Sequence, residues 1–277
     1  MKIRDPSDLK DDRAIRDSLK RLPSSLYKYS GVGEQRLEWL RRLVVDSELY
    51  FERPGNFNDP LDCRIPPSFE ATRDVVERHW KRVAKEQAEP QDRRTRRQAI
   101  KGLIRNSETQ AGRRDMEESV FKSVNRNGIV CLSKDPTNML MWSYYAEGHH
   151  GVALRIDTSL ERLAAFKGQI IPIEVDYKNT LPEINFYHST IKEFVTAVLG
   201  TKAKAWEHEK EWRLISVGNK GYLRAPSGLV NGIIFGIRTK ADVETRIRSW
   251  AERRTSKIEF FRARHRHGSF ELEIIPA

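Results

Sequence analysis

The residues with the clearest chemical potential lie between Lys204 and Ser216, in the sequence KAWEHEKEWRLIS, where acids and bases precede an apolar run. That run predicts a strand, and side chains alternate between the two faces of a strand. One face is therefore expected to carry Glu209, Glu211 and Arg213. Two carboxylates on one face cost energy unless a cation or a ligand offsets their charge, which makes this segment a candidate site. The alternative is an exposed strand in which Glu211 pairs with Arg213 or Lys210.

Two loops carry polar groups that could contact a ligand. The sequence NFNDPLD, from Asn56 to Asp62, has the composition of a tight loop held by Asx turns. Asn58 and Asp59 could present hydrogen-bonding groups from that loop, although a turn without ligand contacts is the alternative. A second loop, EGHHG, offers a histidine contact through His149 or His150.

A further cluster joins the end of a predicted strand to the start of a predicted helix. It spans Leu132 to Ala146 in the sequence LSKDPTNMLMWSYYA, with Ser133 at the strand end. Leu140, Met141, Tyr144 and Tyr145 lie at helical spacing, so core packing explains part of this pattern. An aromatic platform beside the strand end is the functional alternative.

Several common catalytic signatures are absent from the sequence. It contains no HExxH pair, no Gly-x-Ser-x-Gly elbow, no Walker loop and no Gly-x-Gly-x-x-Gly fingerprint. Hydride transfer and P-loop hydrolysis are therefore unsupported. Cys63 and Cys131 are too few for a disulfide framework or a cysteine zinc site, and we expect no metal. A triad built from Ser133 and His149 stays open.

The formal net charge of +11 predicts a polyanionic partner, and much of the excess is local. One basic patch contains Arg93, Arg94, Arg96 and Arg97, and the other is the tail segment 262–267. Either patch could hold the phosphates of a nucleic acid. A solvated helical face is the alternative, because aromatic residues that would stack on bases are scarce in both.

Composition and periodicity indicate a soluble α+β protein. The mean hydropathy is −0.65. The first ten residues lack the apolar core typical of a signal peptide, and no apolar run approaches the roughly 20 residues needed to cross a bilayer. We therefore expect a cytoplasmic protein with no membrane partner. Strands are expected at 26–29, 48–52, 128–133, 151–156, 170–177, 209–217, 232–237, 257–261 and 270–275, and helices at 34–45, 138–147, 188–205 and 241–253. A polar leader over 1–25 then precedes a single domain over 26–277, with an all-helical insertion over 68–127.

The order of these clusters resembles the bacterial domain family of unknown function 2971 (DUF2971). The resemblance covers roughly residues 26–237 and rests on the motifs LYKY, FNDPLD, CLS, MWSYY with the following His and Gly, and W-x-x-EKEWR. Each motif alone is weak, and the set is specific. The family name records no activity, so the resemblance implies a related fold but no particular reaction.

The same order is more weakly similar to that of ADP-ribosyltransferases. This resemblance implies a twisted, mainly antiparallel split sheet with a His, Arg or Tyr on a first strand, a Ser or Tyr motif on a second and a Glu on a later one. The corresponding positions here are Tyr27 or Lys28, then Ser133 or Tyr145, then Glu209 or Glu211. Lys28 departs from the pattern, because a lysine cannot reproduce planar or bidentate contacts to NAD.

The resemblance to transferases implies transfer of ADP-ribose from NAD to a protein or nucleic-acid acceptor, in bacterial defence or a stress response. Glu211 would face the positive charge that develops as nicotinamide leaves, and Glu209 would activate the acceptor. The expected contacts with NAD are stacking by Tyr145 or Trp142, pyrophosphate binding by Lys28 or Arg213, ribose orientation by Ser133, and further contacts from Tyr27, Asn58, Asp59 and His149.

Two alternatives from other functional classes remain. One is a non-catalytic module that binds nucleic acid or a protein partner through the basic patches. The other is a metal-dependent nuclease using Asp59, Asp62 and Glu209. If the transferase motifs form one site, a common concave surface should be lined by Asn58, Ser133, Tyr145 and Glu211.

Overall fold

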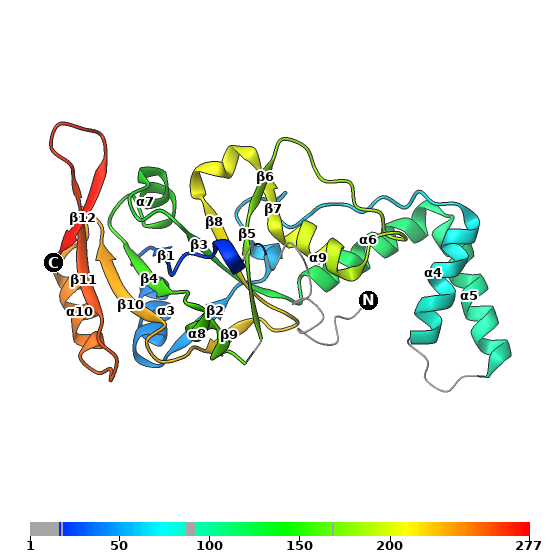
Figure 1. The fold of residues 1–277 in the computed structure, drawn as a ribbon, viewed down its shortest axis with the longest axis horizontal. Helices are drawn as coiled ribbons and strands as arrows, with labels where there is room; N and C mark the ends of the chain where they lie inside the picture. The colour runs from blue at the N-terminus through cyan, green and yellow to red at the C-terminus, as the bar shows by residue number, and fades with distance from the viewer. Residues whose placement is uncertain (1–16, 18, 87–91, 168) are drawn as a thin grey trace.

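The structure of the protein is a computed structural model, which describes residues 17, 19–86, 92–167 and 169–277. Most of the leader expected over 1–25 lies outside the described residues. The chain folds as a mixed α+β structure with a large, mainly antiparallel sheet (Figure 1). Its sheet strands, in chain order, are β1 (Ser25–Ser30), β3 (Gly128–Ser133), β4 (Val152–Asp157), β5 (Ile170–Glu174), β8 (Glu211–Ser216), β10 (Val230–Phe235), β11 (Glu259–His265) and β12 (Leu272–Pro276).

The eight strands run in the order β12-β11-β10-β4-β1-β3-β8-β5, and only β10 and β11 are parallel neighbours. Strand β1 pairs with β4 along six residues but with β3 only where Tyr27 meets Ser133. Strand β3 pairs with β8 over six residues, from Gly128 opposite Ser216 to Ser133 opposite Glu211. Two small sheets add β2 (Glu48–Phe51) with β9 (Gly221–Arg224), and β6 (Asp176–Lys178) with β7 (Thr201–Ala203).

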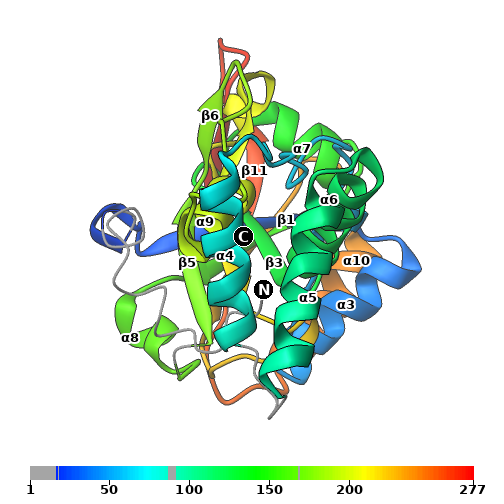
Figure 2. The ribbon, with the colours of Figure 1, turned by 90° about the vertical axis from the view of Figure 1, so that its right-hand side faces the viewer.

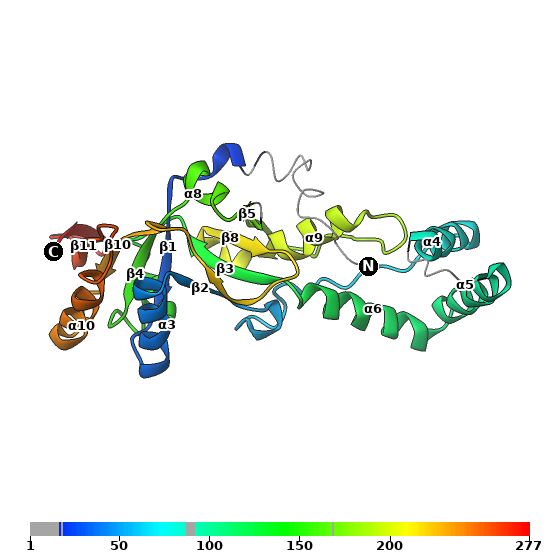
Figure 3. The same cartoon turned by 90° about the horizontal axis from the view of Figure 1, so that it is seen from below.

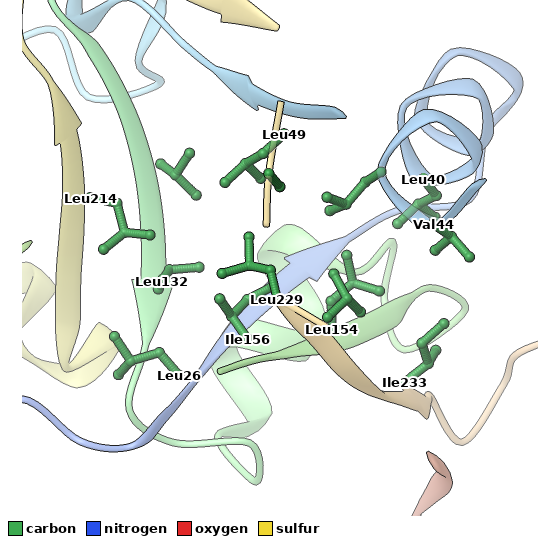
Figure 4. Packing of buried hydrophobic residues seen from close by; sticks show 14 of the residues in the cluster. Leu26, Leu40, Val44, Leu49, Leu132, Leu154, Ile156, Leu214, Leu229 and Ile233 are labelled. Atoms are coloured by element: carbon green, nitrogen blue, oxygen red, sulfur yellow. The ribbon is translucent and has the colours of Figure 1, made fainter. Parts of the chain in front are cut away.

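One face of the sheet carries the largest apolar cluster. It is covered by α3 (Glu34–Val45) and strand β2, which Figure 4 shows, and by α10 (Ala241–Ala251). Leu40 and Val44 of α3 belong to this cluster together with Leu154 of β4 and Ile233 of β10. Because alternate residues of each strand point to this face, the intervening residues of β3 and β8 must point to the other one.

Two helices cover the opposite face at its two ends. Helix α7 (Met139–Tyr145) packs against β1, β4 and the strands beyond them, and α9 (Ile191–Gly200) packs against β3, β8 and β5. Asn138 caps α7 by accepting hydrogen bonds from the backbone N–H groups of Leu140 and Met141. Thr190 and Glu193 form a capping box at the start of α9. The sheet face between these two helices is where the polar residues gather.

The chain between β2 and β3 forms a helical arm, which we define as α4 (Arg73–Glu86), α5 (Arg93–Ser107) and α6 (Gln110–Val124). Figures 1 and 3 show the arm extending away from the sheet, and Figure 2 views it from its far end. Its apolar stripes form a separate cluster that includes Val76, Trp80, Ile104 and Met116. The arm therefore presents a large surface outside the sheet core.

The structure corrects several boundaries expected from periodicity. Helix α9 ends at Gly200, and the chain continues through β7 and the 3-10 helix η2 (Lys204–Glu209), where one helix was expected over 188–205. The strand expected over 209–217 begins only at Glu211, because Lys210 adopts a left-handed conformation with φ of 46° that breaks the extended chain. The strand expected over 170–177 is divided into β5 and β6. The remaining described elements are η1 (Pro54–Asn56) and α8 (Leu160–Ala164).

Candidate functional site

A buried network of charged side chains lies at the ends of β3 and β8, on the sheet face between α7 and α9. Glu211 and Arg213 are neighbours on one face of β8, and Ser133 of β3 is directly opposite Glu211. Glu209 reaches the same place from η2 and not from the strand, through the turn at Lys210. The two glutamates and the arginine therefore come together as expected, but Glu209 lies in the 3-10 helix and not on the strand that carries Glu211 and Arg213.

Arg213 is the centre of this network and is completely buried. Its Nε donates to Glu211 Oε1 at 2.9 Å, and its Nη2 donates to Asp62 Oδ2 at 2.6 Å and to Glu211 Oε2 at 3.2 Å. Its Nη1 donates to the Leu199 carbonyl at 2.8 Å and to Cys63 Sγ at 3.1 Å. A guanidinium has five N–H donors, and these five contacts occupy them. Arg213 thus ties α9 and the 56–62 loop to β8 and has no donor left for a pyrophosphate.

Lys202 of β7 is the second buried cation of the network. Its Nζ lies 2.5 Å from Glu209 Oε2, 2.9 Å from Glu211 Oε2 and 3.6 Å from Asp62 Oδ2. Tyr177, which pairs with Lys202 across β6 and β7, accepts a hydrogen bond from the backbone N–H of Glu211 at 2.8 Å. Sequence reasoning missed both residues. The one available signal is the position of Lys202 two residues after the end of the apolar helix α9, since a lysine there must find a buried acid or remain exposed.

The two glutamates differ in their protonation chemistry. Burial opposes the charge on Glu211, but the guanidinium of Arg213 and the ammonium of Lys202 outweigh this effect and lower its pKa to about 2. Burial raises the pKa of Glu209, and the attraction of Lys202 only partly offsets it, while the charge of Glu211 raises it further. The network holds three carboxylates, including Asp62, against two cations. Glu211 is therefore a fixed anion, and Glu209 is the carboxyl group that can take up a proton.

The network reaches the surface through Tyr145 of α7. Its hydroxyl donates to Glu209 Oε1 at 2.6 Å and accepts from Asn58 Nδ2 at 3.3 Å. Burial, together with the hydrogen bond to Glu209, raises the pKa of this phenol, so it stays protonated and acts as a donor. Tyr145 is half-buried and Asn58 is exposed, whereas Glu209 is only 3% exposed. A path of hydrogen bonds thus joins solvent to a buried carboxyl group.

Ser133 and Trp142 hold this arrangement in place. Ser133 Oγ donates to the Glu209 carbonyl at 2.7 Å and accepts from the Asp135 N–H at 3.1 Å. Trp142 is fully buried, and its Nε1 donates to the Pro136 carbonyl at 2.9 Å. Both side chains support Glu209 and α7 from inside the fold. Asn58, Ser133, Tyr145 and Glu211 therefore share one network, but Ser133 and Glu211 lie within it and do not line a concave surface.

The other predicted ligand contacts are spread around the network. Tyr27 shares the face of Ser133 and packs with the α7 cluster, and Lys28, the next residue, points to the face covered by α3. Burial lowers the pKa of Lys28. Asp59 Oδ1 accepts from the Leu61 N–H at 2.9 Å and makes the expected Asx turn. Tyr27 thus lies on the same face of the sheet as the network, and Lys28 lies on the opposite face.

His149 makes no contact with Ser133 in the described structure, which removes the basis for a triad. Its Nε2 lies 3.3 Å from Ser143 Oγ, and its ring stacks beside Trp142 at 6.3 Å between centroids. The backbone of His149 accepts a hydrogen bond from the Arg238 N–H and donates one to the Trp142 carbonyl. Its role is to close the loop after α7.

The acids of the nuclease alternative are neutralised by side chains of the protein. Asp62 and Glu209 face the cations of Arg213 and Lys202, and Asp59 serves its own turn. Within residues 17, 19–86, 92–167 and 169–277, no group of three or more His, Cys, Asp or Glu side chains is arranged to hold a metal ion. This geometry gives the nuclease interpretation no support.

Comparisons with known proteins identify a family likeness and no activity. Residues 141–214, which include most of α7, Lys202 and both network glutamates, match the family described as "Protein of unknown function (DUF2971)". No curated protein and no solved structure matches the chain. In the part of the chain that the structure describes, we find no helix with the length and apolar character that a membrane crossing needs. The family match covers Tyr145, Lys202, Glu209, Glu211 and Arg213 of the network but not Asp62 or Ser133. The similarity to ADP-ribosyltransferases has no counterpart among these comparisons.

Proposed function

We propose that the protein is an enzyme that transfers ADP-ribose from NAD to an acceptor, with Glu209 and Tyr145 as its reactive pair. The observation that carries this proposal is the buried Glu209 carboxyl group, whose pKa is raised, bonded at 2.6 Å to a half-buried phenol that leads to solvent. A carboxyl group of this kind is suited to general acid–base chemistry near neutral pH.

In this reaction the bond between nicotinamide and the ribose C1′ breaks, and its electron pair leaves with nicotinamide. The acceptor oxygen or nitrogen forms the new bond to C1′, and Glu209 takes the proton that the acceptor loses. Glu211 remains ionised beside it and contributes a fixed negative charge that favours the positive centre developing on the ribose. Because Arg213 and Lys202 hold Glu211 as an anion, we assign it a positioning and electrostatic role. The reactive role moves to Glu209, which Tyr145 connects to solvent.

The side chains available to NAD differ from those expected from the resemblance. Tyr27 and Tyr145 are half-buried on the side of the network and could pack against a nicotinamide ring. Arg213 has no free donor, and Lys28 points to the other face, so neither is assigned to the pyrophosphate. The exposed Lys134, directly after Ser133 at the end of β3, is the cation we assign to that role.

Release of nicotinamide from labelled NAD tests the proposal with water as the acceptor. Glu209→Gln keeps the size of the side chain but removes its basicity, and we expect the rate to fall by roughly 100-fold or more. The matched control is Glu207→Gln, an exposed position in the same 3-10 helix, which should release nicotinamide at the native rate. Circular dichroism verifies folding of both variants.

Two results would overturn the proposal. If the native protein neither binds NAD nor releases nicotinamide, the non-catalytic binding module becomes the better explanation. That candidate has its own support, because Arg213 and Glu211 are saturated by internal contacts, as a purely structural network would be. If Glu209→Gln and Glu207→Gln release nicotinamide equally, Glu209 has no part in the reaction.

A further inference from the structure

We propose that helix α5 of the arm is a docking surface for the phosphate backbone of nucleic acid. This helix contains six basic residues and no acidic residue over Arg93–Ser107, and so carries more than half of the net charge of +11. The inference goes beyond the transferase proposal and does not depend on it, because the arm lies outside the Glu209 network.

The structure distinguishes two patches that look alike in sequence. In the carboxy-terminal hairpin, Arg264 Nε lies 2.6 Å from Glu273, Arg266 pairs with Glu271, and Arg262 pairs with Glu244. Acidic residues of the hairpin and of α10 therefore neutralise the arginines of the tail. Among the described residues, the α5 cations Arg93, Arg94, Arg97, Lys101 and Arg105 make no ion pair.

The arrangement of the α5 cations suits an extended anion. Arg93, Arg97, Lys101 and Arg105 are exposed and follow one another at i, i+4 spacing, so they form a stripe along one side of the helix. At 1.5 Å per residue the stripe is about 18 Å long. One strand of B-form duplex advances 3.4 Å per phosphate, so the stripe spans roughly five phosphates. Ile104 packs into the apolar cluster of the arm, while the four cations of the row remain exposed.

A pocket on the neighbouring helix α4 adds the aromatic component that the sequence patch lacks. Its volume is about 300 Å³, and it is lined by Val75, Arg78, His79, Arg82, Tyr187 and His188. Helices α4 and α5 lie side by side at the end of the arm (Figures 1 and 3). Arg78 on the rim of the pocket is paired with Asp74 at 2.9 Å, so Arg82 is the rim cation that we assign to a phosphate, with the aromatic lining beside it for a base. The arm thus combines a row of phosphate-binding cations with a place where a base can stack.

The test measures binding of fluorescent single-stranded RNA, single-stranded DNA and duplex DNA at several salt concentrations. An arm variant carries Arg93→Gln, Arg94→Gln and Arg97→Gln, and a tail variant with the same loss of charge carries Lys257→Gln, Arg264→Gln and Arg266→Gln. If four phosphates are bound, native affinity should fall about 100-fold between about 50 and 200 mM salt. The arm variant should bind more weakly and reduce the salt slope by about one for each phosphate that it no longer neutralises. The tail variant should bind as the native protein does.

Several outcomes would overturn the inference. Equal weakening by the two variants would assign binding to net charge alone, and failure of the native protein to bind any probe would exclude nucleic acid. Binding to vesicles of anionic phospholipid, without binding to any nucleic acid, would assign α5 to a lipid surface. The arm variant should still release nicotinamide at the native rate, so failure of the docking proposal is distinguishable from failure of the transferase proposal.

Discussion

Replacing Lys202 by methionine should reveal how strongly the buried network depends on its second cation. The substitution keeps the length of the side chain but leaves Asp62, Glu209 and Glu211 facing Arg213 alone. Removing one partner from a buried ion pair commonly costs about 3 to 5 kcal/mol. Because Lys202 contacts all three carboxylates and is itself buried, we expect a value in this range, and a melting temperature lowered by roughly 6 to 20 °C.

The destabilisation should also depend on pH in a defined direction. The pKa of Glu209 is raised in the folded protein, so protonating this group stabilises the fold as the pH falls towards its ordinary value of 4.5. Loss of Lys202 removes a charge that lowers the pKa of Glu209, so the pKa should rise further in the variant. The stability difference between native and variant protein should therefore be largest at pH 7 to 8 and shrink towards about pH 5. Below that range the free energy of unfolding of the native protein should fall. Protonating Glu211, whose pKa is low, weakens its attraction to Arg213 and Lys202.

Urea unfolding followed by tryptophan fluorescence at several pH values gives the required free energies of unfolding. Lys210→Met is the matched control, because Lys210 is half-exposed and its Nζ pairs with Asp135 at the surface, 2.8 Å away. Such surface pairs contribute less than about 1 kcal/mol. If Lys202→Met costs no more than Lys210→Met, or if its cost does not change with pH, the charge assignment for the network is wrong.

Three further predictions concern separate parts of the molecule. Tyr145→Phe removes a hydrogen bond that lowers the pKa of Glu209, so the acid limb of the rate profile for nicotinamide release should move to higher pH; an unchanged profile would separate the phenol from the carboxyl group. Gly151→Ala places a methyl group against the Ser30 carbonyl oxygen, so thermal unfolding should show a free energy of unfolding lowered by about 2 kcal/mol or more. An unchanged free energy of unfolding would contradict this prediction. Arg82→Ala, at the rim of the arm pocket, should weaken binding of single-stranded probes more than binding of duplex, and an equal effect on both would place stacking elsewhere.

Local sequence patterns predicted much of the secondary structure because these patterns act over a few residues. The apolar run of β3 and the helical periodicity of α3 produced elements with the expected bounds, 128–133 and 34–45. The Asx turn at Asp59 also follows from nearby residues alone. Boundaries were missed where a local choice depends on distant contacts. At Lys210 the chain turns into the left-handed region, next to a Glu209 carbonyl held by Ser133 and an Asn138 side chain bonded to His208.

The sequence by itself determined that carboxylates and a guanidinium gather near Glu211, because their spacing along the chain is short. Only the tertiary structure decided which cations neutralise them, since Asp62 lies 151 positions from Arg213 and Lys202 arrives on a separate small sheet. It also decided their protonation, because the pKa of a carboxyl group depends on burial and on neighbours that topology supplies. For the same reason two similar basic runs acquired different properties, with the tail paired to acids across its hairpin and the α5 cations left exposed to solvent.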